Sequence, residues 1–266
     1  MKINSCYSGS FIHTRRLLMR RPAFTRVELL ASILALAGLG LLALPALGAS
    51  ASRSRLAQCF NNLRQVGAGF HSWAMVHGDK FPWQVRKADG GLNNINNESP
   101  VSQNPYVHFA IVSNELVTPR VLICPSDLAI KAASDFSSST TGGFLALNFR
   151  NNAVGYFLGM DATLERPGTM LSGDRNVRTS RAATCGAVFV PANALDGLDP
   201  RVDFTNGLHR FYGQVGLADG SVQTGNGSLL RKLALNSGDG YDPAAIGGFS
   251  PINHILVPGN PQVIPE

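Results

Sequence analysis

The chain has 266 residues, 44% of them hydrophobic and only 15% charged, so it is long enough to fold around a core of its own. A net charge of +6 and a pI near 9.4 would suit a nucleic-acid-binding protein. However, residues 1–23 contain five basic residues and no acidic one, and therefore carry five of the six net charges. The remainder is almost neutral, which argues against a basic binding surface, and we expect no nucleic-acid partner.

An apolar run from Leu29 to Ala49 follows the basic segment, and one glutamate, Glu28, stands at its start. The run has about the 20 apolar residues that a 30 Å bilayer core requires, and the positive charge before it would keep the N-terminus in the cytoplasm. A carboxylate at the centre of a bilayer costs roughly 2.5–3.5 kcal/mol, so Glu28 needs a reason to be there. Three interpretations are open: a signal peptide cut near Ala49-Ser50-Ala51, an uncleaved signal anchor, or a leader removed just before Phe24.

The helical pattern continues beyond the apolar run. Large apolar side chains recur at steps of three, four and seven residues, which predicts an amphipathic helix over 50–78 packed on a globular head; they are Leu56, Phe60, Leu63, Phe70 and Trp73. His77-Gly78-Asp79 predicts the end of this helix. Pro45 lacks a backbone donor and would bend the helix.

The segment Ala23-Phe24-Thr25-Arg26-Val27-Glu28 resembles the processing motif of type IV prepilins and type II secretion pseudopilins. The resemblance implies that prepilin peptidase cuts between Ala23 and Phe24, and that the new amine of Phe24 is methylated. It also implies assembly roles for Glu28, the fifth residue from Phe24, and for Pro45, the twenty-second. Ala23 and Arg26 depart from the family, which usually has Gly before the cut and Leu or Ile at the third position.

The remaining sequence predicts short strands, long loops and one helix. The expected strands are Val121–Cys124, Met170–Ser172, Ala187–Val190 and Gln214–Leu217, with a helix at Ser228–Asn236. We therefore predict an α+β, pilin-like fold: a long bent N-terminal helix, with a transmembrane half and an amphipathic half, packed on a small antiparallel β-sheet head with long loops. The expected divisions are a leader at 1–23, a transmembrane segment at 24–49, the helix continuation at 50–78, the head at 79–240 and a poorly ordered Pro/Gly-rich tail at 241–266.

A second resemblance covers the head, to a large group of bacterial prepilin-like proteins whose heads are uncharacterised. Four segments carry it in order: Gln58–Gln65, Cys124–Asp127, Gly173–Asn176, and His209 followed by Asp219-Gly220. The resemblance implies that His209, Asp219 and Gly220 form a structural motif. Asp219-Gly220 predicts a hairpin turn, which His209 could hydrogen-bond.

The cysteines fit a head in an oxidising compartment. Cys6 would leave with the leader, so Cys59, Cys124 and Cys185 would remain. A Cys59–Cys124 disulfide is favoured because both residues lie in the family segments, with Cys185 left as a buried thiol. A zinc site is the competing interpretation, although no Cys-x2-Cys pair supports it.

Catalysis and metal binding have weaker support in the sequence. His209, Asp219 and Ser221 supply the residue types of a hydrolytic triad, but no Gly-x-Ser-x-Gly motif is present, and we expect no enzyme. Major pseudopilins bind calcium near their C-terminal sheet, and the resemblance makes Asp174 and Asp219 the candidate ligands here. Otherwise no cofactor is expected.

The predicted function is therefore structural: a processed prepilin-like subunit of a pilus or a type II secretion-like pseudopilus. Its implied partners are prepilin peptidase, other pilin or pseudopilin subunits, the inner-membrane assembly platform and membrane lipid. The expected localisation is single-pass in the inner membrane, with the head in the periplasm. The alternative is a signal-anchored periplasmic domain with a binding or hydrolytic role that does not polymerise.

Overall fold

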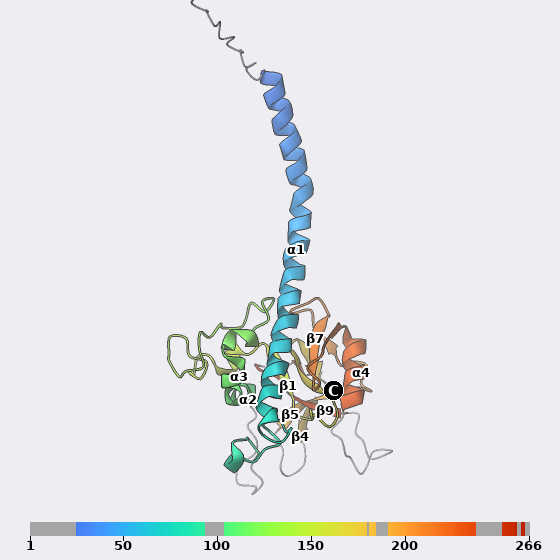
Figure 1. Ribbon diagram of the computed structural model, residues 1–266. Helices are drawn as coiled ribbons and strands as arrows, with labels where there is room; N and C mark the ends of the chain where they lie inside the picture. The colour runs from blue at the N-terminus through green and yellow to red at the C-terminus, as the bar shows by residue number, and fades with distance from the viewer. Residues whose placement is uncertain are drawn as a thin grey trace, which may run out of the picture. The chain divides into compact units, whose positions relative to one another are not determined.

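The computed structural model describes residues 25–93, 104–179, 181–184, 191–237, 252–259 and 262–263 (Figure 1). The chain divides into two units, Met1–Ala49 and Ser50–Glu266. Helix α1 (Arg26–Met75) contributes to both units. The second unit, here called the head, contains every strand that the structure describes.

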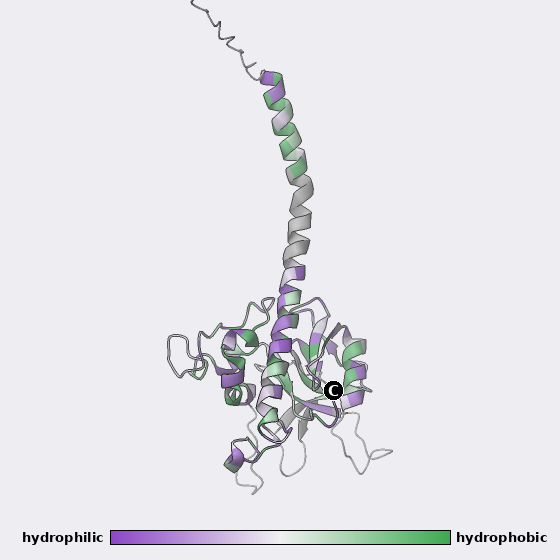
Figure 2. Cartoon of the chain, in the orientation of Figure 1, coloured by the Kyte–Doolittle hydropathy of each residue, from purple (hydrophilic) through white to green (hydrophobic). Residues whose placement is uncertain are grey.

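Helix α1 begins with a capping box. The Glu28 carboxylate accepts hydrogen bonds from the Thr25 backbone N–H at 2.9 Å and from its hydroxyl at 3.0 Å, while the Glu28 N–H donates to the Thr25 hydroxyl at 3.3 Å. These bonds satisfy backbone donors that the first helical turn leaves unpaired. The turns that follow are mostly apolar (Figure 2) and their large side chains are exposed by 54–74%: Val27, Leu29, Leu30, Ile33, Leu34, Leu36 and Leu39.

The predicted fold class is wrong about this helix. In the part of the chain that the structure describes, no helix is sufficiently long and apolar to traverse a membrane, so the expected long bent helix with a transmembrane half is not shown. In the described residues, the charges of Arg26 and Glu28 stand in the first turn of α1, and the large apolar side chains from Leu29 to Leu39 follow them. The same finding contradicts the predicted single-pass localisation in the inner membrane.

The C-terminal part of α1 belongs to the head, and its predicted apolar stripe is buried except at Leu56 and Phe60, which are half-buried. Leu63, Phe70 and Trp73 are buried, and the same face also buries Cys59 and Val66. The helix ends at Met75, and the next residues include two left-handed ones, Gly78 and Asp79. This conformation turns the chain away from the helix axis.

The centre of the head is a curled antiparallel sheet of seven strands (Figure 1). Their spatial order is β4 (Arg181–Thr184), β5 (Pro191–Asp196), β9 (Ile252–Leu256), β1 (Tyr156–Gly159), β2 (Met170–Asp174), β7 (Gly213–Leu217) and β8 (Val222–Gly225). A second sheet has the order β10 (Gln262–Val263), β3 (Val177–Thr179), β6 (Asp203–Phe204), and its β10–β3 pair is parallel.

The remaining elements are short helices and α4. The short α-helices are α2 (Pro105–Ile111) and α3 (Ser113–Leu116), and the 3-10 helices are η1 (Lys87–Asp89), η2 (Pro119–Leu122) and η3 (Arg150–Ala153). Helix α4 (Gly227–Ser237) follows β8.

Both faces of the large sheet are covered, and this explains its nearly unbroken burial. Tyr156 and Leu158 belong to the core cluster that includes the buried face of α1. Phe157, which points the other way, belongs to a second cluster that includes Leu230 and Leu233 of α4. Alternate side chains of β1 therefore enter different cores, so the strand has no solvent-facing side.

Several predicted elements are confirmed, but the strand predicted at Val121–Cys124 and the poorly ordered tail predicted at 241–266 are wrong. Strand β2, the β7–β8 hairpin with its Asp219-Gly220 turn, and α4 are all present, whereas Ala187–Val190 lies outside the described residues. The predicted strand at Val121–Cys124 overlaps η2 instead, because Pro119 favours the first turn of a helix and the Thr118 hydroxyl caps it. The tail was expected to be poorly ordered, but it contains β9, which pairs with β1 and β5 in the interior of the sheet.

Candidate functional site

A disulfide connects α1 to the rest of the head. Cys59, on the buried face of α1, is bonded to Cys124, which lies just after η2, and both residues are 0% exposed. The Asn62 side chain donates to the Ile123 carbonyl at 2.7 Å and so fixes the backbone beside Cys124. This is the pairing that the family resemblance implied. Cys185 lies outside the described residues.

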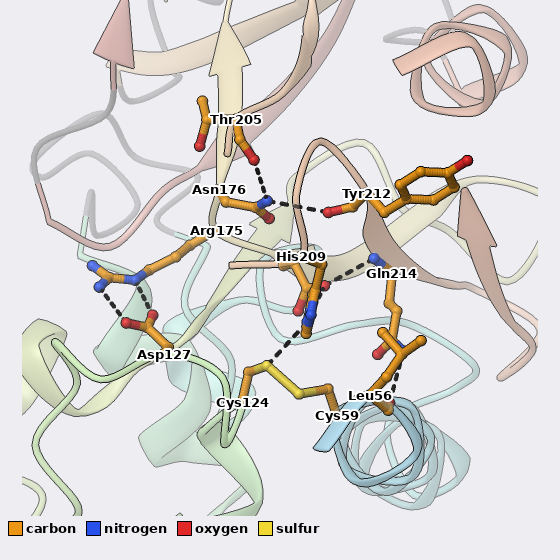
Figure 3. Close-up of polar contacts among 11 residues, drawn as sticks. Leu56, Cys59, Cys124, Asp127, Arg175, Asn176, Thr205, His209, Tyr212 and Gln214 are labelled. Atoms are coloured by element: carbon orange, nitrogen blue, oxygen red, sulfur yellow. Dashed lines mark hydrogen bonds and ion pairs between the residues drawn. A yellow bond between two sulfur atoms is a disulfide. The ribbon is translucent and has the colours of Figure 1, made fainter. Parts of the chain in front are cut away.

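His209 lies against this disulfide (Figure 3). Its Nε2 atom is 3.3 Å from Cys124 Sγ and 3.5 Å from an oxygen of Asp174 in β2. The two residues after it, Arg210 and Phe211, have φ values of 53° and 66°. Such left-handed residues cost about 1–2 kcal/mol each unless they are glycine, so the fold maintains a strained turn directly beside the histidine.

Asp174 is fully buried and incompletely paired. One carboxylate oxygen accepts a hydrogen bond from the Gln214 backbone N–H at 2.9 Å, and the other, Oδ1, has no hydrogen-bond partner within the described part of the chain. Burial raises the pKa of Asp174 to about 7, and the nearby Asp127 carboxylate adds to the increase. Burial also lowers the pKa of His209, so its imidazole is neutral at pH 7. The His209–Asp174 contact is therefore polar rather than a full ion pair.

Neighbouring hydrogen bonds fix the position of the site. The Asn176 side chain donates to the carbonyls of Thr205 and Tyr212, at 3.0 and 3.2 Å, and thereby fastens both ends of the loop that carries His209. The Gln214 side chain donates to the Leu56 carbonyl of α1 at 2.9 Å.

An ion pair next to Asp174 joins Arg175 to Asp127. Arg175 forms two bonds to the nearly buried Asp127 carboxylate, at 2.5 and 3.0 Å. The cluster is thus surrounded by bonded groups from β2, β7 and α1, which makes its geometry rigid.

The other predicted site residues of the head have separate roles. Asp219 is exposed, and its carboxylate accepts from the Ser221 N–H within the β7–β8 turn, where Gly220 has a φ of 81°. The Ala218 carbonyl of this hairpin contacts His71 at 2.5 Å, the role that was expected of His209. Asp174 and Asp219 therefore lie in different settings, one in the interior and one at the surface.

One group of potential metal ligands occurs among the residues that the structure describes. It contains Cys59, Cys124 and His209, whose ligand atoms all lie within 4.8 Å of one another. The sequence suggested a role for each residue but did not predict that they share one site, because 65 residues separate the two cysteines and His209 is distant from both along the chain. The signal that could have found the group was the order of the family segments, which contain all three residues and Asp174.

The predicted processing site lies at the edge of the described residues. Ala23 and Phe24 fall outside them, as does the side chain of Pro45, whose backbone belongs to α1. Glu28 is described, and its hydrogen bonds with Thr25 lower the pKa of its carboxyl group. Glu28 is therefore ionised at neutral pH.

No family model, no curated protein and no solved structure matches the chain.

We expect replacing Asp174 with Asn to change how stability depends on pH in the oxidised protein. Between about pH 4 and 7 the Asp174 carboxyl is protonated in the folded protein and ionised in the unfolded chain. The proton is thus bound more tightly by the folded state, so this contribution to stability is complete below about pH 4 and is lost as the pH rises to about 7. As the pH rises through this window, the free energy of unfolding of Asp174→Asn should increase relative to that of the wild type, by at most about 1.4 kcal/mol per pH unit.

Urea unfolding of both proteins at a series of pH values measures this difference. The asparagine oxygen can still accept from Gln214, and His209 is present in both proteins, so the comparison isolates the carboxyl group. Asp219→Asn is the control, since that carboxylate is exposed. A difference between Asp174→Asn and the wild type that stays constant from pH 4 to pH 8 would contradict the prediction.

Proposed function

We propose that this protein is a structural subunit that a prepilin-type peptidase cuts and methylates at Phe24, and that assembles with other copies into a pilus or secretion pseudopilus. The observation that carries the proposal is the start of α1. There, an ionised Glu28 is followed by large apolar side chains that are more than half exposed.

This apolar surface favours assembly. Covering one valine, leucine or isoleucine side chain contributes about 1.5–3 kcal/mol, and seven such side chains occur between Val27 and Leu39. A continuous apolar surface on an isolated protein indicates a site of interaction. The same segment of a second copy is a suitable partner, because two apolar helices can pack their ridges and grooves together along their length.

Glu28 supplies the specificity that apolar contact lacks. Both hydrogen bonds that its carboxylate accepts from Thr25 use the same oxygen, Oε2, so Oε1 can accept a further bond. Removal of the leader would create a cationic amine at Phe24. Pairing of this amine with Glu28 of a neighbouring subunit would fix the axial register of the two helices, since a displaced register would leave both charges unpaired.

Sequencing the N-terminus of the protein, purified from the cells that make it, tests the processing step. We expect the mature chain to start at an N-methylated Phe24. A chain that starts at Met1 would support the alternative that does not polymerise, and a start at Ser52 would contradict both.

Replacing Glu28 with Ala tests the assembly step. We expect the variant to be lost from filaments while its head stays folded, because Glu28 belongs to the other unit and its described side-chain hydrogen bonds are made to Thr25 in the same helical turn. Incorporation is measured by the amount of subunit in sheared filament fractions, and circular dichroism checks the fold. Glu165→Ala removes an exposed glutamate of the head and should assemble normally. Wild-type incorporation of Glu28→Ala would refute the role of Glu28.

A further inference from the structure

We propose that reduction of the Cys59–Cys124 disulfide creates a binding site for a thiophilic divalent cation, for which Zn²⁺ is the best fit. The ligands would be the sulfurs of Cys59 and Cys124, Nε2 of His209 and a carboxylate oxygen of Asp174. This site is distinct from the α1 segment on which filament assembly depends, so the two proposals stand or fall separately.

The distances between ligand atoms suit a tetrahedral ion. His209 Nε2 lies 3.3 Å from Cys124 Sγ and 3.5 Å from Asp174 Oδ2. Zinc–ligand bonds of about 2.0–2.3 Å place neighbouring ligand atoms of a tetrahedral site about 3.3–3.8 Å apart. Nε2 of His209 is therefore already at the correct spacing from two further ligands. Breaking the disulfide lets the Cys59 sulfur move away from that of Cys124 to the same spacing.

The chemistry of the donors also suits zinc. Two thiolates, one imidazole and one carboxylate are all common zinc ligands, whereas calcium and magnesium prefer oxygen ligands alone.

Asp174 provides a second and independent observation. It is 0% exposed, and within the described residues its Oδ1 atom has no hydrogen-bond partner, although buried polar atoms are nearly always paired. A carboxylate in this position costs free energy unless something compensates it. A cation held by His209 and the two sulfurs would lie beside Oδ2 of this carboxylate and would offset the charge that the carboxylate carries.

The fold holds the four ligands on separate elements. Cys59 lies on α1, Cys124 follows η2, Asp174 ends β2, and His209 lies in the loop before β7. Hydrogen bonds from Asn62, Asn176 and Gln214 hold these elements in place independently of the disulfide. The ligands should therefore remain close together after reduction.

The reaction that opens the site requires a dithiol. The disulfide accepts two electrons and two protons from the dithiol, which becomes a disulfide itself, and Cys59 and Cys124 become thiols. When Zn²⁺ binds, both thiols release their protons to solvent and form zinc–sulfur bonds. A disulfide that accepts the two electrons back by thiol–disulfide exchange would re-form the Cys59–Cys124 bond and release the ion, so the bond and the metal site exclude each other.

The test uses the full chain with Cys6 and Cys185 replaced by Ser, so that Cys59 and Cys124 are its only cysteines. The protein is reduced with dithiothreitol, freed of the reductant under nitrogen, and mixed with Zn²⁺ or Co²⁺. We expect about one zinc per reduced chain and none per oxidised chain. Bound cobalt should show absorption from thiolate-to-metal charge transfer and from tetrahedral coordination. Zinc should also raise the melting temperature of the reduced protein.

Single-residue variants distinguish this site from incidental binding. In the same background, His209→Ala should weaken zinc binding by more than about tenfold, and Asp174→Asn should weaken it to a smaller extent. His77→Gln, which alters a histidine stacked on Trp73 away from the cluster, should have no effect. Equal weakening by His209→Ala and His77→Gln would indicate binding by an unfolded chain and would overturn the proposal. So would a reduced protein that binds no more zinc than a variant in which Cys59 and Cys124 are also replaced by Ser.

Discussion

Replacing both Cys59 and Cys124 with Ala should lower the free energy of unfolding by about 4 kcal/mol. The disulfide closes a loop between positions that are 65 residues apart, and a cross-link of this span removes about that much chain entropy from the unfolded state. The substitution also deletes two buried sulfur atoms, which adds a smaller packing loss. The effect is a large part of the 5–15 kcal/mol by which ordinary domains are stable.

Urea unfolding at neutral pH, followed by circular dichroism, measures this loss as a lower midpoint. The wild-type protein kept under reducing and metal-free conditions should have a similar midpoint, because it loses the same cross-link. Cys185→Ala, which leaves the bond intact, is the control. If the double variant and the wild type unfold at the same urea concentration, the bond contributes no net stability to the head.

Replacing Phe70 with Ala should lower the free energy of unfolding by about 3–5 kcal/mol. Phe70 is 0% exposed, and its ring packs edge-on against Phe81, Trp83 and Phe109, with centroids 6.1, 5.7 and 5.8 Å away. Removing the ring leaves a cavity at the junction of α1 with α2 and with the loop that follows α1, and the three aromatic partners cannot all move to fill it.

Met75→Ala is a matched control in the same helix. Its side chain is 77% exposed, so the expected change is within about 0.5 kcal/mol. Thermal unfolding of the two variants and the wild type gives the comparison. A loss for Phe70→Ala as small as that for Met75→Ala would show that the aromatic cluster is not the centre of the core.

The sequence predicted those parts of the fold that depend on local patterns. The apolar stripe through Leu63, Phe70 and Trp73 has helical spacing, and Asp219-Gly220 is a turn signal between two alternating segments, so both could be found without tertiary information. The apolar run after Glu28 was misjudged because its length alone was taken to predict a transmembrane helix. The described part of the chain has no helix that meets that requirement, and α1 carries the charges of Arg26 and Glu28 in its first turn.

The candidate metal site could not be predicted in the same way. His209 contacts Cys124 from a turn in which Arg210 and Phe211 take up left-handed conformations, which neither residue type favours. Asp174 is buried because β2 is covered on both faces. The local sequence Gly173-Asp174-Arg175 is equally typical of an exposed turn. Such features arise from long-range packing and leave no periodic pattern in the sequence.

The position of β9 affects how the head folds during synthesis. Ile252–Leu256 pairs with β1 on one side and with β5 on the other, and so joins strands that are made much earlier. Until this segment leaves the ribosome, β1 and β5 each expose an edge that can pair with the wrong strand. The head thus completes its sheet only after Ile252–Leu256 has been made, through contacts of high sequence separation, which makes folding slow. A chain that ends before Ile252 would contain most of the core residues and still have an open sheet.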